Sequence, residues 1–391
     1  MDESYSIYIH IPFCQQRCFY CDFNTLASMD DKIDAYIKAL KQEIDVLTRH
    51  FEHQIPVHSI YIGGGTPSYI NPQYIAEVMR LLYQRFDIQS DSEITIEANP
   101  GTLNREKLKA YLENGINRIS LGVQSTDDVF LKKLGRIHNF KEVETNIELA
   151  RKCGFLNISA DLIFGLPNQT LSHWQKSLAR MVEFSLEHLS LYSLTIEEGT
   201  PFGTWFDEGK LIVPDEDVIA DQYAYAITWL ADQGYEQYEI SNWRKTDINH
   251  DFRSKHNCQY WINKPYIGFG LGAHSCFEKR RIANTSNLGE YIKAIRNGKD
   301  GVLEELPASI SVDTLTSMDE MKETMMLGLR LVNEGVSKQM FTDRFHQKMD
   351  DVFAADIKEL LHHELVQWVD DRLVLTQRGV LLGNQVFMHF V

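Results

Sequence analysis

The sequence is poor in cysteine, in basic side chains and in long apolar runs. Its 391 residues include 6 cysteines, which are too few for a disulfide scaffold in a chain of this size. Lys and Arg total 39 against 55 Asp and Glu, a formal net charge of −16, which argues against an extended nucleic-acid surface or an anionic membrane as the main contact. No stretch reaches the ~20 apolar residues that a membrane-spanning helix needs.

The first residues, MDESYSIYIH, also lack the basic segment and apolar run of a secretory signal. We therefore expect a cytoplasmic protein with reduced thiols, for which neither nucleic acid nor an integral membrane span is a partner. The composition leaves peripheral membrane contact and a homodimer open.

Half of the cysteines are clustered in the sequence: Cys14, Cys18 and Cys21 have the spacing CxxxCxxC. Three thiolates can hold three irons of a [4Fe–4S] cube, whereas full ligation needs four, so one iron is left open. We expect these thiols to have low pKa values and the open iron to be sensitive to oxidants. A zinc site would need a fourth Cys or His nearby, and the intervening residues provide none. Zinc and three unrelated buried cysteines remain the alternatives.

Short apolar strands alternate with amphipathic helices, the pattern of a βαβ protein with a parallel sheet. Strands are predicted at 6–11, 59–64, 93–98, 118–123, 157–164 and 188–194. Helices are predicted at 30–51, 72–86, 104–115, 140–154 and 170–184, with a further helix at 215–234 and a strand at 235–243. Six βα units fit a partial barrel, although periodicity alone does not separate it from an open doubly wound sheet.

The pattern predicts three parts. Residues 1–240 form the βα part, 241–300 form an extension that carries HNCQYW and a glycine-rich segment, and 301–391 form a mostly helical end with a helix–strand–turn–strand pattern at 365–379. Residues 301–391 hold 8 basic and 15 acidic side chains. We therefore expect the last part to serve structure or partner docking rather than DNA binding.

Polar residues or glycines follow each predicted strand, at the end where a parallel barrel forms its ligand site. Gly63, Gly64 and Gly65 follow the second strand, where missing side chains let the backbone approach a ligand, although a tight turn would explain them equally well. Glu97 and Gln124 end the third and fourth strands, and an isolated polar side chain after an apolar run usually faces solvent or a ligand.

These motifs resemble the radical S-adenosylmethionine (SAM) superfamily, and most closely its branch with oxygen-independent coproporphyrinogen III dehydrogenase (HemN) and the heme chaperone family HemW. The resemblance runs from Tyr8 almost to Val391. It implies a partial (β/α)6 barrel, a small winged-helix-like C-terminal domain and SAM bound to the open iron. It also implies SAM contacts from Tyr8, Tyr20, Gly64, Gly65, Thr66, Glu97, Gln124, Arg136, Asp161 and Ser193.

Taken singly, several of these residues have plainer explanations. Tyr8 and Tyr20 could be core tyrosines, Arg136 a surface cation and Asp161 a buried, hydrogen-bonded carboxylate. Their coincidence with the cysteine triad favours a common site.

The second chemical feature is HNCQYW, which we predict to lie in a polar loop. His is a common axial ligand of heme iron and Cys258 is another candidate, whereas a lone His in a loop is more often structural. The segment resembles the HNxxYW heme-binding motif of HemW, which implies heme contacts from His256, Asn257 and Tyr260.

Two departures separate the sequence from HemN. HemN has a further Cys two residues after the third cluster Cys, where this chain has Phe23, and HemN has a long N-terminal extension that we expect to be missing here. Both favour a chaperone that binds heme and passes it to an unidentified acceptor protein. The alternatives are a radical enzyme that decarboxylates coproporphyrinogen III and a regulatory protein with a vestigial cluster.

Overall fold

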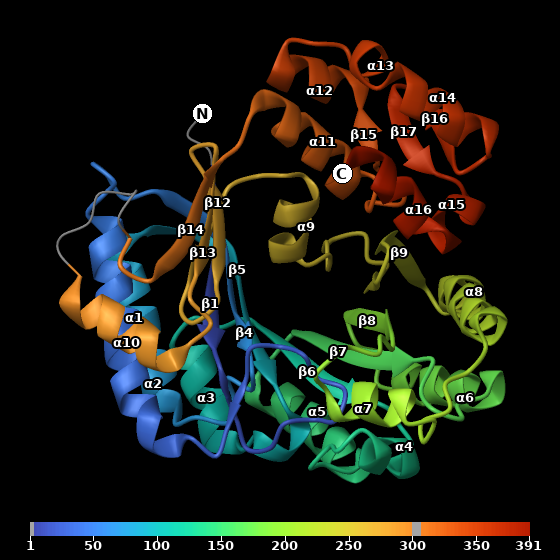
Figure 1. The fold of residues 1–391 in the computed structure, drawn as a ribbon. Coiled ribbons are helices and arrows are strands. Elements are labelled where there is room, and N and C mark those ends of the chain that lie inside the picture. The colour runs from blue at the N-terminus through green and yellow to red at the C-terminus, as the bar shows by residue number, and fades with distance from the viewer. Residues whose placement is uncertain (1–3, 299–305) are drawn as a thin grey trace.

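A large twisted sheet with helices on one side dominates the computed structural model, which describes residues 4–298 and 306–391 (Figure 1). Its six central strands run parallel in chain order: β1 (Tyr5–Ile11), β4 (Pro56–Gly64), β5 (Asp87–Ala98), β6 (Arg118–Gln124), β7 (Asn157–Phe164) and β8 (His188–Ser193). The order has no reversal, which a doubly wound sheet requires. The six-unit partial barrel is therefore confirmed.

The connecting helices cover the outer face of these strands: α1 (Ile33–Thr48), α2 (Pro72–Arg85), α3 (Arg105–Glu113), α4 (Asp128–Lys133), α5 (Phe140–Cys153), α6 (Leu171–Val182), α7 (Pro201–Asp207) and α8 (Glu216–Asp232). Local sequence sets their ends. Helix α5, for example, begins with a capping box between Asn139 and Glu142 and ends at Gly154, whose φ of +116° favours glycine. Buried aliphatic side chains from strands and helices then form one continuous core.

The barrel stays open because both of its edges pair with other strands. Strand β1 pairs in parallel with β11 (Tyr266–Phe269), which continues into β12 (His274–Phe277), β13 (Arg280–Asn284) and β14 (Ser309–Thr314). At the other edge β8 pairs with the hairpin of β9 (Tyr235–Glu239) and β10 (Asn242–Lys245). The extension also contributes α9 (Lys255–Trp261) and α10 (Leu288–Asn297).

Two expectations for this extension were wrong. Residues 235–243 form part of a hairpin rather than one strand, because the buried Glu239 carboxylate accepts from the Ser241 backbone at 3.0 Å and from the Asn242 side chain, which ties the chain into a turn. HNCQYW lies in helix α9 rather than in a polar loop, since Ser254 caps it by accepting from Asn257 N at 3.3 Å.

The C-terminal part has its own buried core and lies over α9 and β9 (Figure 1). Its elements are α11 (Ser317–Gly328), β15 (Val336–Ser337), α12 (Lys338–Phe345), α13 (Met349–Val352), α14 (Ala354–His362), β16 (Val366–Val369), β17 (Arg372–Leu375), α15 (Gln377–Leu381) and α16 (Gly383–Phe387). The three strands form a small antiparallel sheet: β16 and β17 are the two strands that the helix–strand–turn–strand pattern predicts, and β15 was not predicted. The boundaries at 240 and 300 remain our proposal, and the second falls at residues outside the described ranges.

No helix among residues 4–298 and 306–391 is both long and apolar enough to cross a membrane.

Candidate functional site

The cysteine loop leaves the sheet where β1 ends. A short parallel pair, β2 (Phe13–Cys14) with β3 (Leu26–Ala27), closes the loop at its base. All three thiols are free, with Cys14 buried and Cys18 and Cys21 partly exposed. The loop therefore holds the three thiols together beside the carboxyl end of the first strand.

The expected low thiol pKa values were wrong for two of the three cysteines. Burial raises the pKa of Cys14 to about 11, against a weak opposing contact from the Thr66 hydroxyl 3.5 Å from its sulfur. Burial also raises the pKa of Cys21. The thiolates must therefore be stabilised by whatever they ligate, as metal ions do when they displace thiol protons.

The surroundings of the thiols fit a bulky cluster better than a single ion. Within the described residues, no three His, Cys, Asp or Glu side chains converge as a single-ion site. Each thiolate of a [4Fe–4S] cube binds its own iron, so the three need not meet at one point. Gly65 provides room beside them, since a Cβ there would lie 2.5 Å from Pro12 O and 2.9 Å from Cys14 Sγ.

The glycine turn after β4 is tied to Glu97 on the neighbouring strand. Gly64 N donates to Glu97 Oε2 at 3.0 Å, and the Tyr61 hydroxyl donates to Oε1 at 2.9 Å. Gly64 has a φ of +115°, and a Cβ there would also collide with the ring of His10. The backbone N–H groups of Gly65 and Thr66 donate to the Ile11 and Phe13 carbonyls. The backbone of the turn can therefore offer a ligand only its carbonyl oxygens.

Two partly buried carboxylates, Glu97 and Asp161, face the barrel interior. Burial, together with the nearby Asp161, raises the pKa of Glu97 to about 7 against the opposing effect of the Tyr61 hydrogen bond. Burial also raises the pKa of Asp161, which accepts from the Ser120 hydroxyl at 3.2 and 3.3 Å. Such a pair can bind ammonium, sulfonium or hydroxyl groups of a ligand through charge-assisted contacts.

Arg136 connects this site with the cysteine loop. Its guanidinium donates to Gly122 O at 2.6 Å and lies 3.4 Å from Cys18 Sγ, while its buried Nε has no partner among the described residues. Gln124 lies beside it with a φ of 65°, an unusual conformation for a residue other than glycine. An unpartnered buried donor and a strained strand end both fit a ligand site.

The remaining SAM candidates lie around this centre. The Tyr8 hydroxyl lies 3.0 Å from His10 Nδ1, and Tyr20 packs beside Phe202 with ring centroids 6.4 Å apart. Ser193 is exposed at the end of β8. Of these three, Ser193 lies at the carboxyl end of its strand, whereas Tyr8 lies in the middle of β1.

His256 is buried, with 1% of its surface exposed, and both ring nitrogens have partners. Its Nδ1 lies 3.1 Å from Ser59 Oγ and its Nε2 lies 2.9 Å from the Tyr260 hydroxyl. Burial lowers its pKa to about 3. A metal could reach Nε2 only if Tyr260 moved away.

Tyr61 connects the heme candidates with the SAM candidates, although their separation in the sequence suggests independent sites. The Tyr61 ring stacks on His256, with centroids 5.1 Å apart, and its hydroxyl binds Glu97. Asn257 and Cys258 lie on the same helix, and burial raises the pKa of Cys258 to about 12.

Sequence reasoning missed Arg118, a cation that is 2% exposed inside the barrel. Its guanidinium lies 4.0 Å from Glu93 and 3.4 Å from the Thr95 hydroxyl. A charged residue at the start of the otherwise apolar strand RISLGV was the available signal. Tyr61 gave no such signal, because a tyrosine in a strand is ordinary.

Comparisons with known proteins identify the family. Residues 8–181 match the radical SAM superfamily, and residues 315–382 match the HemN C-terminal domain. The heme chaperone HemW of Bacillus subtilis (strain 168) is 38% identical over 387 residues, which cover 99% of each chain. The chain belongs to the HemW family.

Other relatives extend this family relationship. A mitochondrial protein of Danio rerio, radical S-adenosyl methionine domain-containing protein 1, is 34% identical and covers 97% of this chain and 85% of its own. The solved structure of Escherichia coli coproporphyrinogen III oxidase (HemN), a radical SAM enzyme, has a TM-score of 0.84 at 25% identity over 100% of this chain and 90% of that chain. This HemW-family chain therefore has the radical SAM fold, and the family implies SAM and a [4Fe–4S] cluster.

Proposed function

We propose that this chain binds heme and transfers it to an acceptor protein while it carries a SAM-coordinated [4Fe–4S] cluster. The observation that carries the proposal is its 38% identity over almost its full length to a protein named as a heme chaperone. We also propose a cytoplasmic location.

Cys14, Cys18 and Cys21 would hold the cluster, and Tyr8, Tyr20, Gly64, Gly65, Thr66, Glu97, Gln124, Arg136, Asp161 and Ser193 would surround SAM. When bound, the cluster can supply an electron to SAM. The chain's own contribution is positional, because Glu97 and Asp161 offer partly buried carboxylate oxygens and Arg136 a buried, unpartnered Nε donor, its guanidinium lying close to Cys18.

His256, Asn257 and Tyr260 would bind heme, with His256 or Cys258 as the iron ligand. Ligation by His256 requires the Tyr260 hydroxyl to give up its contact with Nε2. Because both residues belong to α9, a movement of the helix as a whole would carry them together, so the Tyr260 side chain itself would have to turn away to free the nitrogen.

A heme titration of the anaerobically reconstituted chain tests this site. We expect His256→Ala, or Cys258→Ala in its place, to weaken heme binding at least tenfold, because an iron ligand is lost. His188→Ala is the matched control, since His188 is equally buried and lies 2.8 Å from Ser159 Oγ and 2.9 Å from the Tyr238 hydroxyl. Wild-type heme affinity in both His256→Ala and Cys258→Ala would reject α9 as the heme site. A loss of heme affinity in His188→Ala as large as in the test variants would reject it too.

The similarity to HemN at a TM-score of 0.84 supports a second candidate, a radical enzyme acting on coproporphyrinogen III. Phe23 argues against it, because its exposed side chain stands where HemN is expected to have a further Cys. Formation of 5′-deoxyadenosine together with conversion of coproporphyrinogen III would favour the enzyme over the chaperone.

A further inference from the structure

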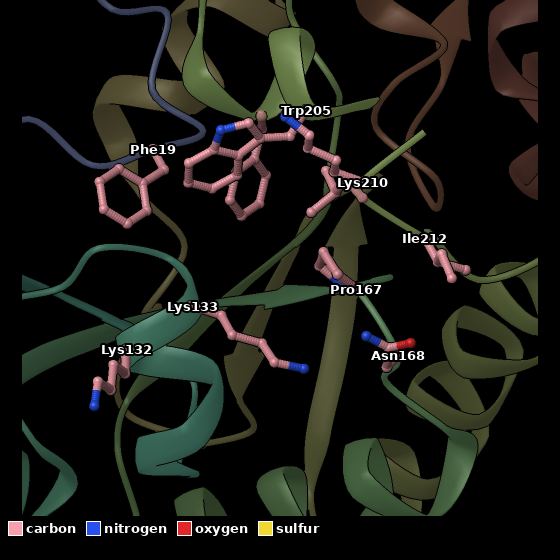
Figure 2. A pocket seen from close by; sticks show the side chains of 10 residues that line it. Phe19, Lys132, Lys133, Pro167, Asn168, Trp205, Lys210 and Ile212 are labelled. Atoms are coloured by element: carbon pink, nitrogen blue, oxygen red, sulfur yellow. The ribbon is translucent and has the colours of Figure 1, made fainter. Parts of the chain in front are cut away.

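A cavity of about 340 Å³ lies beside the cysteine loop, between Phe19, the end of α4 and the segment around α7 (Figure 2). None of the residues proposed to bind SAM or heme lines it. Its volume falls within the range of about 300–1,000 Å³ typical of small-molecule sites. The cavity is therefore large enough to take a ligand of its own.

The walls of the cavity are aromatic. Phe19 and Phe202 both contact Trp205, with ring centroids 5.2 and 5.7 Å away. Phe202 N donates to Phe19 O at 3.0 Å, which fixes α7 against the cysteine loop. Aromatic surfaces held in this way and left partly open suit a flat, apolar ring.

The rim of the cavity is basic. Lys132, Lys133 and Lys210 line it, and the described lining includes no acidic side chain, although the chain as a whole has a charge of −16. Lys132 and Lys133 have no carboxylate partner in the described part of the chain, and Lys210 pairs with Glu208 at 2.8 Å. Both members of that pair are exposed, so a bound anion can compete for Lys210.

The lysines differ in where they point. In Figure 2 the Lys133 side chain reaches toward Pro167 and Asn168, and Lys210 lies beside Trp205, whereas Lys132 points outward. Two cations thus border an aromatic wall. This arrangement matches a flat ring with carboxylates at its edge.

We propose that this cavity binds the ring of a porphyrin, with Lys133 and Lys210 pairing with the carboxylates at its edge. The proposal rests on the proposed function, since it assumes that the chain handles heme. No His, Cys, Met or Tyr is among the described lining residues, so this binding does not need iron. The site would hold heme at the surface, whereas His256 is enclosed.

Metal-free protoporphyrin IX tests the proposal, because its fluorescence reports binding and it has no iron for α9 to ligate. We expect the full chain to bind it and the Lys133→Ala/Lys210→Ala variant to bind at least tenfold more weakly, with the difference shrinking at high salt. Trp205→Leu should weaken binding even at high salt, since it removes ring contact. The control variant is Lys348→Ala/Lys358→Ala, which removes two exposed lysines from the C-terminal part.

The controls separate this proposal from the proposed function. Unchanged protoporphyrin affinity in the control and in His256→Ala would support the cavity as a distinct site. A chain that binds heme but not protoporphyrin IX, or cavity variants that bind protoporphyrin like the wild type, would overturn it and leave the heme function standing. Binding of neither compound would reject the proposed function itself.

Discussion

Two carboxylates in the barrel interior combine negative charge with partial burial. Glu97 and Asp161 lie near each other, and burial raises the pKa of both carboxyls. Buried carboxylates of this kind are costly unless a cation or a hydrogen-bond donor compensates them. A bound SAM molecule, which carries a sulfonium and an amino group, would supply such compensation.

We expect Glu97→Gln to weaken SAM binding about ten- to a hundredfold, because a buried hydrogen bond to a charged group contributes roughly 1.5–3 kcal/mol. Isothermal titration with the reconstituted chain measures this, with Glu183→Gln, an exposed glutamate on the outer face, as control. The cluster spectrum should persist, since the carboxylate makes no contact with the thiols. Unchanged affinity in Glu97→Gln and in Asp161→Asn would show that SAM binds elsewhere.

His256 should make stability depend on pH. Its folded-state pKa of about 3 lies below the ordinary value of 6.5, so the unfolded chain binds the proton first as the pH falls. The stabilising contribution is complete above pH 6.5 and is lost between there and pH 3, and it amounts to about 2 kcal/mol between pH 7 and pH 5.

Urea denaturation of the apo chain at pH 7 and pH 5 checks this expectation. The wild type should lose about 2 kcal/mol more than His256→Gln over that interval, because the other buried groups are common to both proteins and cancel. Equal losses would mean that His256 is already solvated or protonated in the folded chain.

The strands and helices of the barrel follow from the sequence, but the elements that complete its edges do not. Alternating apolar strands and amphipathic helices predict all six βα units and place Glu97 and Gln124 at strand ends, since those signals are local. Strand β11 has only four residues and pairs with β1 across some 260 residues of sequence, a partnership that no local period encodes.

The local sequence also did not predict helix α9 or the buried environment of its residue His256. Seven mixed residues, KHNCQYW, have no clear period, and their helix depends on the Ser254 cap and on packing. The burial of His256 results from contacts with Ser59 and Tyr61, which lie far away in the sequence. The cysteine triad, by contrast, could be recognised from the sequence because its three members lie within eight residues of one another.

The glycine turn after β4 offers a test of the cluster site. Gly65→Ala should lower the iron content of the reconstituted chain several-fold, because its Cβ would lie 2.9 Å from Cys14 Sγ and 2.5 Å from Pro12 O. Gly101→Ala is the control, since its nearest contact would be 3.5 Å. The triple variant Cys14→Ala/Cys18→Ala/Cys21→Ala gives the iron content expected when no cluster is bound. Four irons per chain in that triple variant would refute the cluster assignment.

At the scale of the whole molecule, helix α9 joins the core of the barrel to the core of the C-terminal part. Trp261, the last residue of α9, packs under the Arg330 guanidinium of the C-terminal part at 4.3 Å, and Arg330 lies 3.8 Å from the buried Glu239. Arg344 adds a hydrogen bond of 2.8 Å to Asn263 O. The C-terminal part therefore packs against the helix that we propose to bind heme.

One paired assay tests the central claim most directly. The anaerobically reconstituted chain is given SAM, a reductant and coproporphyrinogen III, and a parallel sample is titrated with heme. We predict that heme binds and that protoporphyrinogen IX does not form above the level of the triple cysteine variant. Formation of protoporphyrinogen IX with matching 5′-deoxyadenosine, and no heme binding, would contradict the chaperone function and favour the HemN-type enzyme.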